Sequence, residues 1–375
     1  SVEVDLTVLW VTIAGFLVFF MHAGFTLLES GMTQSKNAVN IAMKNLMAIS
    51  VGTVIYWFIG YSLMYGESDN GFFRWSGFFT QKGPPEAYDL FFQTMFAATC
   101  ATIVSGAVAE RMNQWPFFAL VVFIAAFIYP VQGYWNWGGG FLSSGGYSDY
   151  AGSGTVHLCG AAAALAVVTV LGPRKGKYNA DGSVNPMPGS NIPLAALGAW
   201  ILWLGWFGFN GGSELVVSSE ASAIAVSQVF LNTNMAAAGG VIAALLTSLF
   251  ATGKMDVTMA INGAIAGLVA ITAGPSAPTG GEAVFIGAAG GVLFYFSILF
   301  FDKTLKVDDP VGAISAHGTV GILGVMVVPF TSDASFLWQL YGVLAIGGFT
   351  YIASLIVTFI INIIMPIRAT DEEQD

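Results

Sequence analysis

The sequence predicts an all-α integral membrane protein with eleven transmembrane helices. Three observations lead to this class: 55% of the 375 residues are hydrophobic, only 9% are charged, and the uncharged residues gather in long runs. Soluble domains contain roughly 25% charged residues. The chain also has 46 glycines, and small residues of this kind let membrane helices pack closely.

Eleven runs of 19 residues or more contain no Asp, Glu, Lys or Arg. A helix of about 20 residues crosses the roughly 30 Å hydrocarbon layer, so each run is long enough for one span. The longer runs also contain loop signals such as NWGGGFLSSGG, and we expect their helices to be shorter than the runs. In chain order the spans are predicted within 6–28, 45–66, 90–109, 112–148, 150–173, 182–213, 221–253, 257–281, 283–301, 310–332 and 334–367.

The distribution of basic residues predicts the orientation of these spans. An odd number of spans places the termini on opposite sides of the membrane, and Lys and Arg are enriched on the cytoplasmic side. The side without the C-terminus carries only Arg74 and Lys82. We therefore predict a multi-pass protein of the cell membrane with its N-terminus outside and its C-terminus in the cytoplasm. The connections on the predicted cytoplasmic side contain Lys36, Lys44, Arg111, Arg174, Lys175, Lys177, Lys254, Lys303, Lys306 and Arg368.

Two segments share one spacing of aspartate and histidine. Asp149 precedes His157 by eight residues at the start of the fifth span, and Asp309 precedes His317 by eight at the start of the tenth. Five spans separate the copies, so they run in opposite directions, as in transporters built from inverted repeats. The sequence thus predicts an inverted five-plus-five helix repeat.

The repeat divides the predicted membrane domain, residues 1–368. The two halves are expected within about 6–173 and 182–332, and 334–367 forms an additional eleventh helix. Residues 369–375 are expected to form a short acidic cytoplasmic tail, which contributes to the net charge of −10.

The spacing also predicts the depth of the two histidines. A helix rises about 1.5 Å per residue, so eight residues carry each imidazole about 12 Å inward, near the midplane. Positions related by the repeat axis can meet on it, which makes His157 and His317 candidates for a facing pair. Ionisable residues inside a membrane usually mark a pathway or a relay. The alternative is that each is a neutral core residue bonded to a helix backbone.

Several other functions have little support. Two imidazoles alone fall short of a zinc site, and His22, which has no partner in the repeat, is interpreted as structural. Cys100 and Cys159 lie in predicted helices and are interpreted as small apolar packing residues. An acidic chain is a poor nucleic-acid partner. We expect no enzyme, metal or cofactor, because no nucleophile with a base and no phosphate-binding loop appears.

Seven stretches, two of which contain the aspartate–histidine segments, occur in order over ten of the spans: AGFTLLESGMTQSKNAVN, FQTMFAATCATIVSGAVAER, WNWGGGFLSSGGYSDYAGSGTVHLCG, LGPRKGKYNADGSVNPMPGSNIPLAALGAWILWLGWFGFNGGS, VFLNTNMAAAGG, INGAIAGLVAITAG and FFDKTLKVDDPVGAISAHGTVGILG. Together they resemble the Amt/Mep/Rh family of ammonium transporters, on its Amt side. The resemblance implies eleven helices, a homotrimer with one pore per subunit, and a pore histidine pair matching His157 and His317.

The resemblance also implies roles for other residues. The family's outer vestibule attracts ammonium through an aromatic face and a hydroxyl. Trp137 and Ser213 match these two groups, and Phe96 matches a further residue of the vestibule. Two stacked phenyl rings that close the pore match Phe96 and Phe209. Asp149 matches an acidic residue near the vestibule floor that serves structure and ion recognition without facing the pore. The implied mechanism is ion binding, deprotonation, and passage of ammonia with a proton relay along the histidines.

Two alternatives to ammonium transport remain. An ammonium sensor domain of a larger signalling protein would bind the ion with little or no transport. This hypothesis is motivated by the ending PIRATDEEQD, where family transporters continue into a tail used for inter-subunit contact and for control by a PII-type regulator. A gas channel of the Rh type has less support, because Phe96 and Phe209 match the Amt pattern. The partners considered are thus ammonium or ammonia, the bilayer, further copies of the chain, and a PII-type regulator or fused signalling module.

Overall fold

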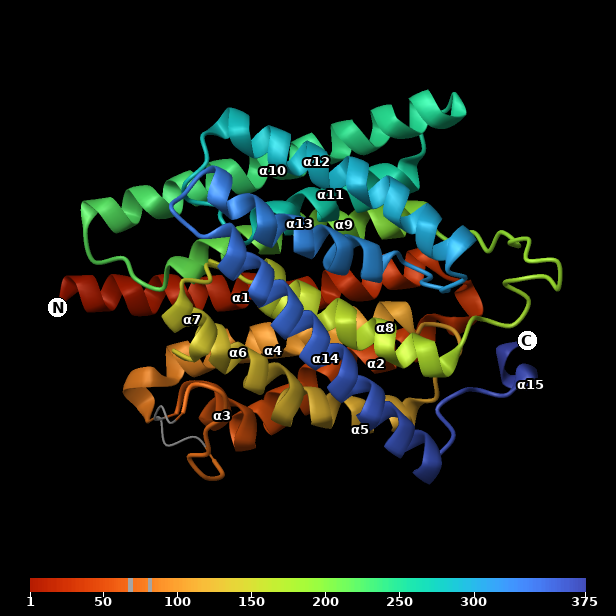
Figure 1. The fold of residues 1–375 in the computed structure, drawn as a ribbon, viewed down its shortest axis with the longest axis horizontal. Coiled ribbons are helices and arrows are strands. Elements are labelled where there is room, and N and C mark those ends of the chain that lie inside the picture. Colours follow the sequence, from red (N-terminus) through yellow and green to blue (C-terminus); the bar gives the residue numbers. More distant parts are fainter. Residues whose placement is uncertain (67–69, 80–82) are drawn as a thin grey trace.

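The fold is a bundle of helices that run roughly along the longest axis of the molecule, as the computed structural model shows (Figure 1). The structure describes residues 1–66, 70–79 and 83–375. The N-terminus lies at one end of the bundle and the C-terminus at the other (Figure 1). These ends are called the N-terminal face and the C-terminal face below. Lys82, which was counted with Arg74 in predicting the orientation, lies outside the described residues.

Nine helices within the described ranges are long and apolar enough to cross a membrane, and two shorter apolar helices, Val257–Ile271 and Ile314–Phe330, accompany them. This confirms the predicted all-α, multi-pass class. The first five spans contain α1 (Val2–Met32), α2 (Ala38–Ile55) with α3 (Tyr61–Tyr65), α4 (Ala87–Ala107), α5 (Gln114–Phe123) with α6 (Tyr129–Asn136) and α7 (Phe141–Gly145), and η5 (Ser153–Leu158) with α8 (Cys159–Leu171). The others contain α9 (Ile192–Gly211) with η6 (Gly212–Glu214), α10 (Glu220–Thr252), α11 (Val257–Ile271), α12 (Gly280–Leu299), η8 (Ile314–Thr319) with α13 (Val320–Val327), and α14 (Phe336–Ile364).

Two of the boundaries that differ from the sequence prediction show why it fails. In the second span, α2 begins at Ala38, about seven residues earlier than expected, so Lys44 lies inside α2 and is buried, whereas it was assigned to the preceding connection. The sixth span begins only at Ile192, because Asn191 caps α9 by accepting a hydrogen bond from the N–H of Leu194 (3.0 Å) and a proline follows in the first turn. Charge-free runs therefore misplace ends where a charge is buried or a loop is uncharged.

Glycines allow several helices to touch backbone to backbone. A Cβ added to Gly198 of α9 would lie 2.6 Å from the carbonyl oxygen of Gly24 in α1. One added to Gly240 of α10 would lie 2.1 Å from the carbonyl oxygen of Gly263 in α11. Such distances leave no room for any side chain, as in other close contacts between membrane helices. These close contacts hold α1 against α9, and α10 against α11 and α12.

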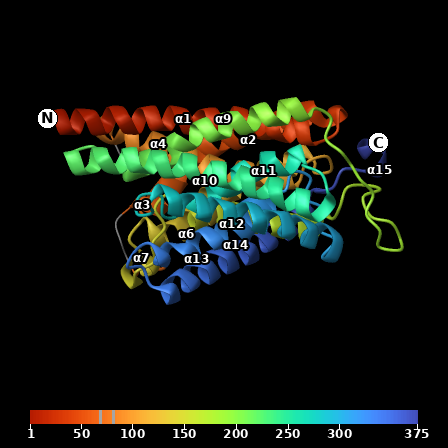
Figure 2. The same cartoon turned by 90° about the horizontal axis from the view of Figure 1, so that it is seen from above.

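The helix α14 closes the bundle on one side. It crosses the other helices diagonally in Figure 1 and lies in one outer layer beside α13 in Figure 2, with α1 and α9 in the opposite layer. It packs mainly on α8. The additional eleventh helix thus supports α8, which continues from the first histidine segment.

Candidate functional site

The first histidine segment starts from Asp149. Its carboxylate accepts hydrogen bonds from the backbone N–H groups of Gly152 (3.0 Å), Gly154 (3.0 Å) and Thr155 (2.9 Å). Gly152 has φ +111°, a left-handed conformation that glycine adopts readily. Its carbonyl oxygen accepts the N–H of His157 (2.9 Å), a wide π-helical turn. Asp149 thus caps the segment that carries the histidine.

The second segment repeats this device from the opposite end of the bundle. The carboxylate of Asp309 accepts the N–H groups of Ala313 (3.1 Å) and Ile314 (2.7 Å), and Gly312 has φ +73°. η8 is π-helical like η5 and carries His317. Each segment therefore starts with an aspartate followed three residues later by a left-handed glycine, a signal present in DYAG and DPVG.

The two histidines meet in the middle of the bundle. Their Nδ1 atoms are 2.8 Å apart, and their rings are 5.0 Å apart with planes at 13°. Both side chains are buried. Of two neutral imidazoles in such a contact, one must donate from Nδ1 and the other accept there. The donor then has a bare Nε2 and the acceptor an Nε2–H, so the pair presents one acceptor and one donor.

Aromatic rings surround the pair. Trp206 stacks on His157 at 5.0 Å and 10°, and Phe209 contacts the same imidazole at 5.3 Å. Phe25 contacts His317 at 6.1 Å. Nε2 of His157 has no hydrogen-bond partner within the described part of the chain. The imidazoles therefore sit in an apolar, aromatic environment, in which Nε2 of His157 is free to bind a small ligand.

Two phenyl rings separate His157 from a cavity on the side of the N-terminal face. Phe96 and Phe209 stack at 4.1 Å with planes at 9°, and both are fully buried. Phe96 also contacts Trp137 edge-on at 5.9 Å. Ring contacts therefore run without a break from Trp137 through Phe96 and Phe209 to His157.

This first cavity has a volume of ≈ 120 Å³. Trp137 and Ser213 both line it, and the Trp137 indole donates to the carbonyl oxygen of Asp149 (2.9 Å). The Ser213 hydroxyl donates to the carbonyl oxygen of Phe209 (2.7 Å), which leaves its lone pairs able to accept. The remaining lining residues are Tyr65, Phe92, Gln93, Phe96, Tyr150 and Leu215.

Carboxylates also lie beside this cavity, although the sequence analysis did not select them. The hydroxyl of Tyr150 donates to Glu214, and that of Tyr65 donates to Gln93 (2.9 Å), whose amide lies 3.4 Å from Asp89. Negative groups at a cavity mouth raise the local concentration of small cations.

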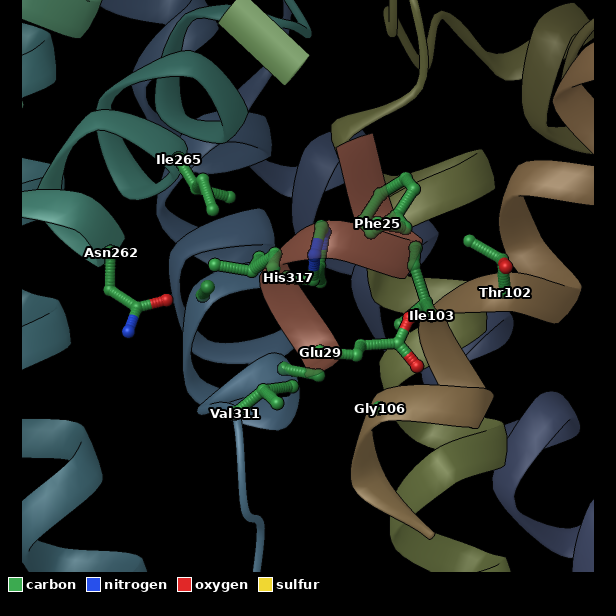
Figure 3. A pocket seen from close by; sticks show the side chains of 12 residues that line it. Phe25, Glu29, Thr102, Ile103, Gly106, Asn262, Ile265, Val311 and His317 are labelled. Carbon is green, nitrogen blue, oxygen red and sulfur yellow. The ribbon is translucent and has the colours of Figure 1, made fainter. Parts of the chain in front are cut away.

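A second, much smaller cavity lies on the other side of the histidine pair. Its volume is ≈ 10 Å³, about the space one water molecule needs. Figure 3 shows His317, Phe25 and Glu29 around it. Glu29 is buried on α1. It was not selected from the sequence because its charge ends the first charge-free run, 6–28.

Ion pairs fix the C-terminal face around the start of the second segment. Arg174 binds Asp308 through Nε (2.9 Å) and a second nitrogen (3.0 Å) and also pairs with Glu110. Burial acts to raise the pKa of Asp308, but the Arg174 hydrogen bonds and the charge of Arg111 outweigh it and hold that pKa below its usual value. Asp309 makes no ion pair within 4.0 Å in the described part of the chain. Burial raises its pKa to about 6, against the opposing effects of the Ile314 and Ala313 N–H groups and of Arg111.

Asp149 is buried and does not line the first cavity. Burial raises the pKa of its carboxyl, while the N–H groups of Thr155, Gly154 and Gly152 act in the opposite direction. Its hydrogen bonds to these backbone N–H groups are those of a helix cap.

The structure brings His157, His317, Phe96 and Phe209 together, and Trp137 and Ser213 line the cavity next to Phe96. His22 lines neither cavity. Cys100 and Cys159 are buried free thiols with sulfur atoms 3.6 Å apart. Among the described residues, no group of three or more His, Cys, Asp or Glu side chains is placed to hold a metal ion.

Comparison with known proteins shows the family. The family model described as Ammonium Transporter Family matches residues 9–375. The chain belongs to the ammonium transporter family. This family consists of transporters rather than enzymes, in agreement with the sequence analysis.

Individual relatives of the ammonium transporter family agree with this assignment. Ammonium transporter Amt2 of Archaeoglobus fulgidus is 42% identical over 350 residues, which cover 89% of this chain and 73% of the relative. A solved structure titled Sensor Amt Protein matches with a TM-score of 0.95 and 36% identity, covering 100% of this chain and 97% of that one. The crystal structure of Candida albicans Mep2 matches with a TM-score of 0.85 and 26% identity, over 98% and 86% of the two chains.

Proposed function

We propose that this chain carries ammonium across the membrane along the path from the Trp137 cavity, past the Phe96–Phe209 rings, to the histidine pair. The observation that carries the proposal is the direct Nδ1–Nδ1 contact of two buried imidazoles in an otherwise aromatic surrounding. Family membership and the relatives named as ammonium transporters support the same substrate.

The Trp137 cavity suits the ammonium ion. Ammonium is a compact cation with four N–H donors, and the face of a tryptophan attracts such a cation by up to about 2 kcal/mol when water is removed. The Ser213 hydroxyl keeps lone pairs free for an N–H donor. Glu214 adds negative charge near the entrance.

The ion loses its proton before it passes the phenyl rings. Phe96 and Phe209 offer no hydrogen-bond acceptor, and moving an ion into such surroundings costs several kcal/mol or more. Neutral ammonia avoids most of this cost. Beyond the rings, the two outer imidazole nitrogens can orient ammonia and pass a proton, because one accepts and the other donates.

A second candidate function is ammonium sensing. The match to the structure titled Sensor Amt Protein covers the whole chain, and this observation favours a domain that binds ammonium with little or no transport. Transport remains the leading proposal, because the vestibule, gate and histidine residues are all present in one path.

We also propose an orientation and partners. The basic residues of the C-terminal face support a cytoplasmic C-terminus. Many large apolar side chains are exposed along the spans, including Trp200 and Phe250, which fits contact with lipid and with other subunits in a homotrimer. Native mass spectrometry of the detergent-solubilised protein tests the trimer, and pull-down with a PII-type protein tests that regulator.

Currents from proteoliposomes on a solid-supported membrane test transport. Ammonium should elicit a sustained current, whereas potassium should elicit little. An internal pH dye measures ammonia entry in the same vesicles. Monodisperse protein that binds ammonium but gives neither a current nor a pH change would favour the sensor.

A further inference from the structure

Glu29 lies on the exit side of the histidine pair. Phe25, one helical turn earlier on α1, contacts the ring of His317 at 6.1 Å. Four residues advance a helix by about 6 Å, and α1 ends three residues after Glu29 on the C-terminal face. Glu29 and His317 line the same small cavity (Figure 3). A carboxylate therefore stands between His317 and the C-terminal face.

The hydrogen bonds of this carboxylate leave it able to bind more. The Ser105 hydroxyl donates to it at 2.7 Å, and the Asn45 amide approaches at 3.3 Å. The buried Lys44 interacts with it electrostatically, but no ion pair within 4.0 Å joins them in the described part of the chain. A carboxylate has about four acceptor positions, so some remain for another donor.

Other acceptors surround the same space. The Thr102 hydroxyl donates to Asn45 (2.9 Å), which leaves its lone pairs to accept, and Asn262 contributes an amide oxygen. The cavity has about the volume of one water molecule, and ammonium is of similar size. Its lining is mainly apolar, but the Glu29 carboxyl group, the Thr102 hydroxyl and the Asn262 amide offer acceptors to a small cation with four N–H donors.

We propose that Glu29 forms a second ammonium site on the exit side of the histidine pair and returns the proton to ammonia there. The inference rests on the proposed transport function. The proton released at the Trp137 cavity reaches Glu29 through His317 and converts the carboxylate into a carboxylic acid. Ammonia then takes that proton on its lone pair, and the products are a carboxylate and an ammonium ion beside it.

A purely structural role predicts something different. In that case Glu29 joins α1 to α2 and α4 through Asn45 and Ser105, and its replacement lowers stability and all transport together. Proton return instead requires the carboxylate for charge movement, while ammonia passage does not need it. The two roles separate in an assay that records current and internal pH from the same preparation.

The test uses the Glu29→Gln variant, which keeps the side-chain size but cannot exchange a proton, in proteoliposomes. The ammonium current should fall by about tenfold or more, a typical effect of losing an acid–base group. Ammonia entry, measured by the internal pH dye, should stay within about twofold of the ammonia entry through the unmodified protein. Glu3→Gln, an exposed position on the same helix, is the matched control and should leave both signals unchanged.

Other outcomes overturn the proposal. An unchanged current in Glu29→Gln would do so, as would equal loss of current and ammonia entry. If Glu29→Gln is not monodisperse, Glu29→Asp decides: it withdraws the carboxylate by one methylene, so the current should fall while ammonium selectivity stays, and an unchanged current would refute the assignment. Silence of the unmodified protein in both assays would instead contradict the proposed function and remove the inference with it.

Discussion

Trp206 stacks on His157 with ring centroids 5.0 Å apart and planes at 10°. The indole is itself held by a hydrogen bond from its N–H to the Thr272 hydroxyl (2.9 Å). His157 makes a contact of the same kind with His317, at 5.0 Å and 13°. The orientation of the His157 ring, and therefore the position of its Nδ1 atom, depends on Trp206.

Replacing Trp206 by Leu should lower both stability and the ammonium current. Truncating a fully buried aromatic residue costs roughly 3 kcal/mol in the free energy of unfolding, and His157 would lose the ring that orients it. Thermal unfolding in detergent and current in proteoliposomes measure the two effects. Trp206→Phe keeps an aromatic face and should retain more current, so equal currents from Leu, Phe and the unmodified protein would refute this role.

Asp149→Asn and Asp309→Asn should both destabilise the protein, and Asp149→Asn should do so more. Asp149 accepts three backbone N–H groups and Asp309 accepts two. Each buried donor that loses its acceptor costs about 1–3 kcal/mol. Unfolding in detergent measures the difference, with the exposed Asp333→Asn as control. The reverse order would show that capping does not set the cost.

Trp137→Ala should raise the ammonium concentration that gives half-maximal current. Loss of a cation–π contact of up to about 2 kcal/mol corresponds to a rise of up to about thirtyfold. The exposed Trp115→Ala is a control that should leave this concentration unchanged. A value for Trp137→Ala equal to that of the control would place the ion elsewhere.

Acid should weaken the fold through Asp308. Because its pKa is lowered in the folded protein, mainly by Arg174 acting against burial, its contribution to stability is present above the unfolded pKa of about 3.9 and is lost as the pH falls through the folded pKa. Asp308→Asn should therefore lower the melting temperature at neutral pH and reduce its fall in acid. A melting curve whose acid dependence is the same in the variant would exclude Asp308 as the source.

The spacing of residues predicted much of the site. Eight residues between aspartate and histidine, in two oppositely directed spans, predicted that His157 and His317 face each other, because helix rise and repeat symmetry fix both depth and position. The structure contains that contact. Trp206 lies within the stretch that ends in WFGFNGGS, three residues before Phe209 on the same helical face, and this spacing could have identified it.

Glu29 and Lys44 were harder to predict. A charged residue marks the end of a span where it is exposed, but not where two neighbouring helices bury a basic and an acidic side chain together. Glu29 and Lys44 lie on neighbouring helices and are both buried. Their proximity depends on how α1 packs against α2, which no local pattern in the sequence records.

The most direct test of the histidine path is the ammonium current of His157→Ala and His317→Ala, compared with the unmodified protein in the same liposomes. Both variants should form monodisperse protein, because the helix caps at Asp149 and Asp309 remain, and both should lose the current or its selectivity for ammonium over potassium. A full, selective ammonium current in either variant would contradict the assignment of the pair as the path for ammonia and its proton.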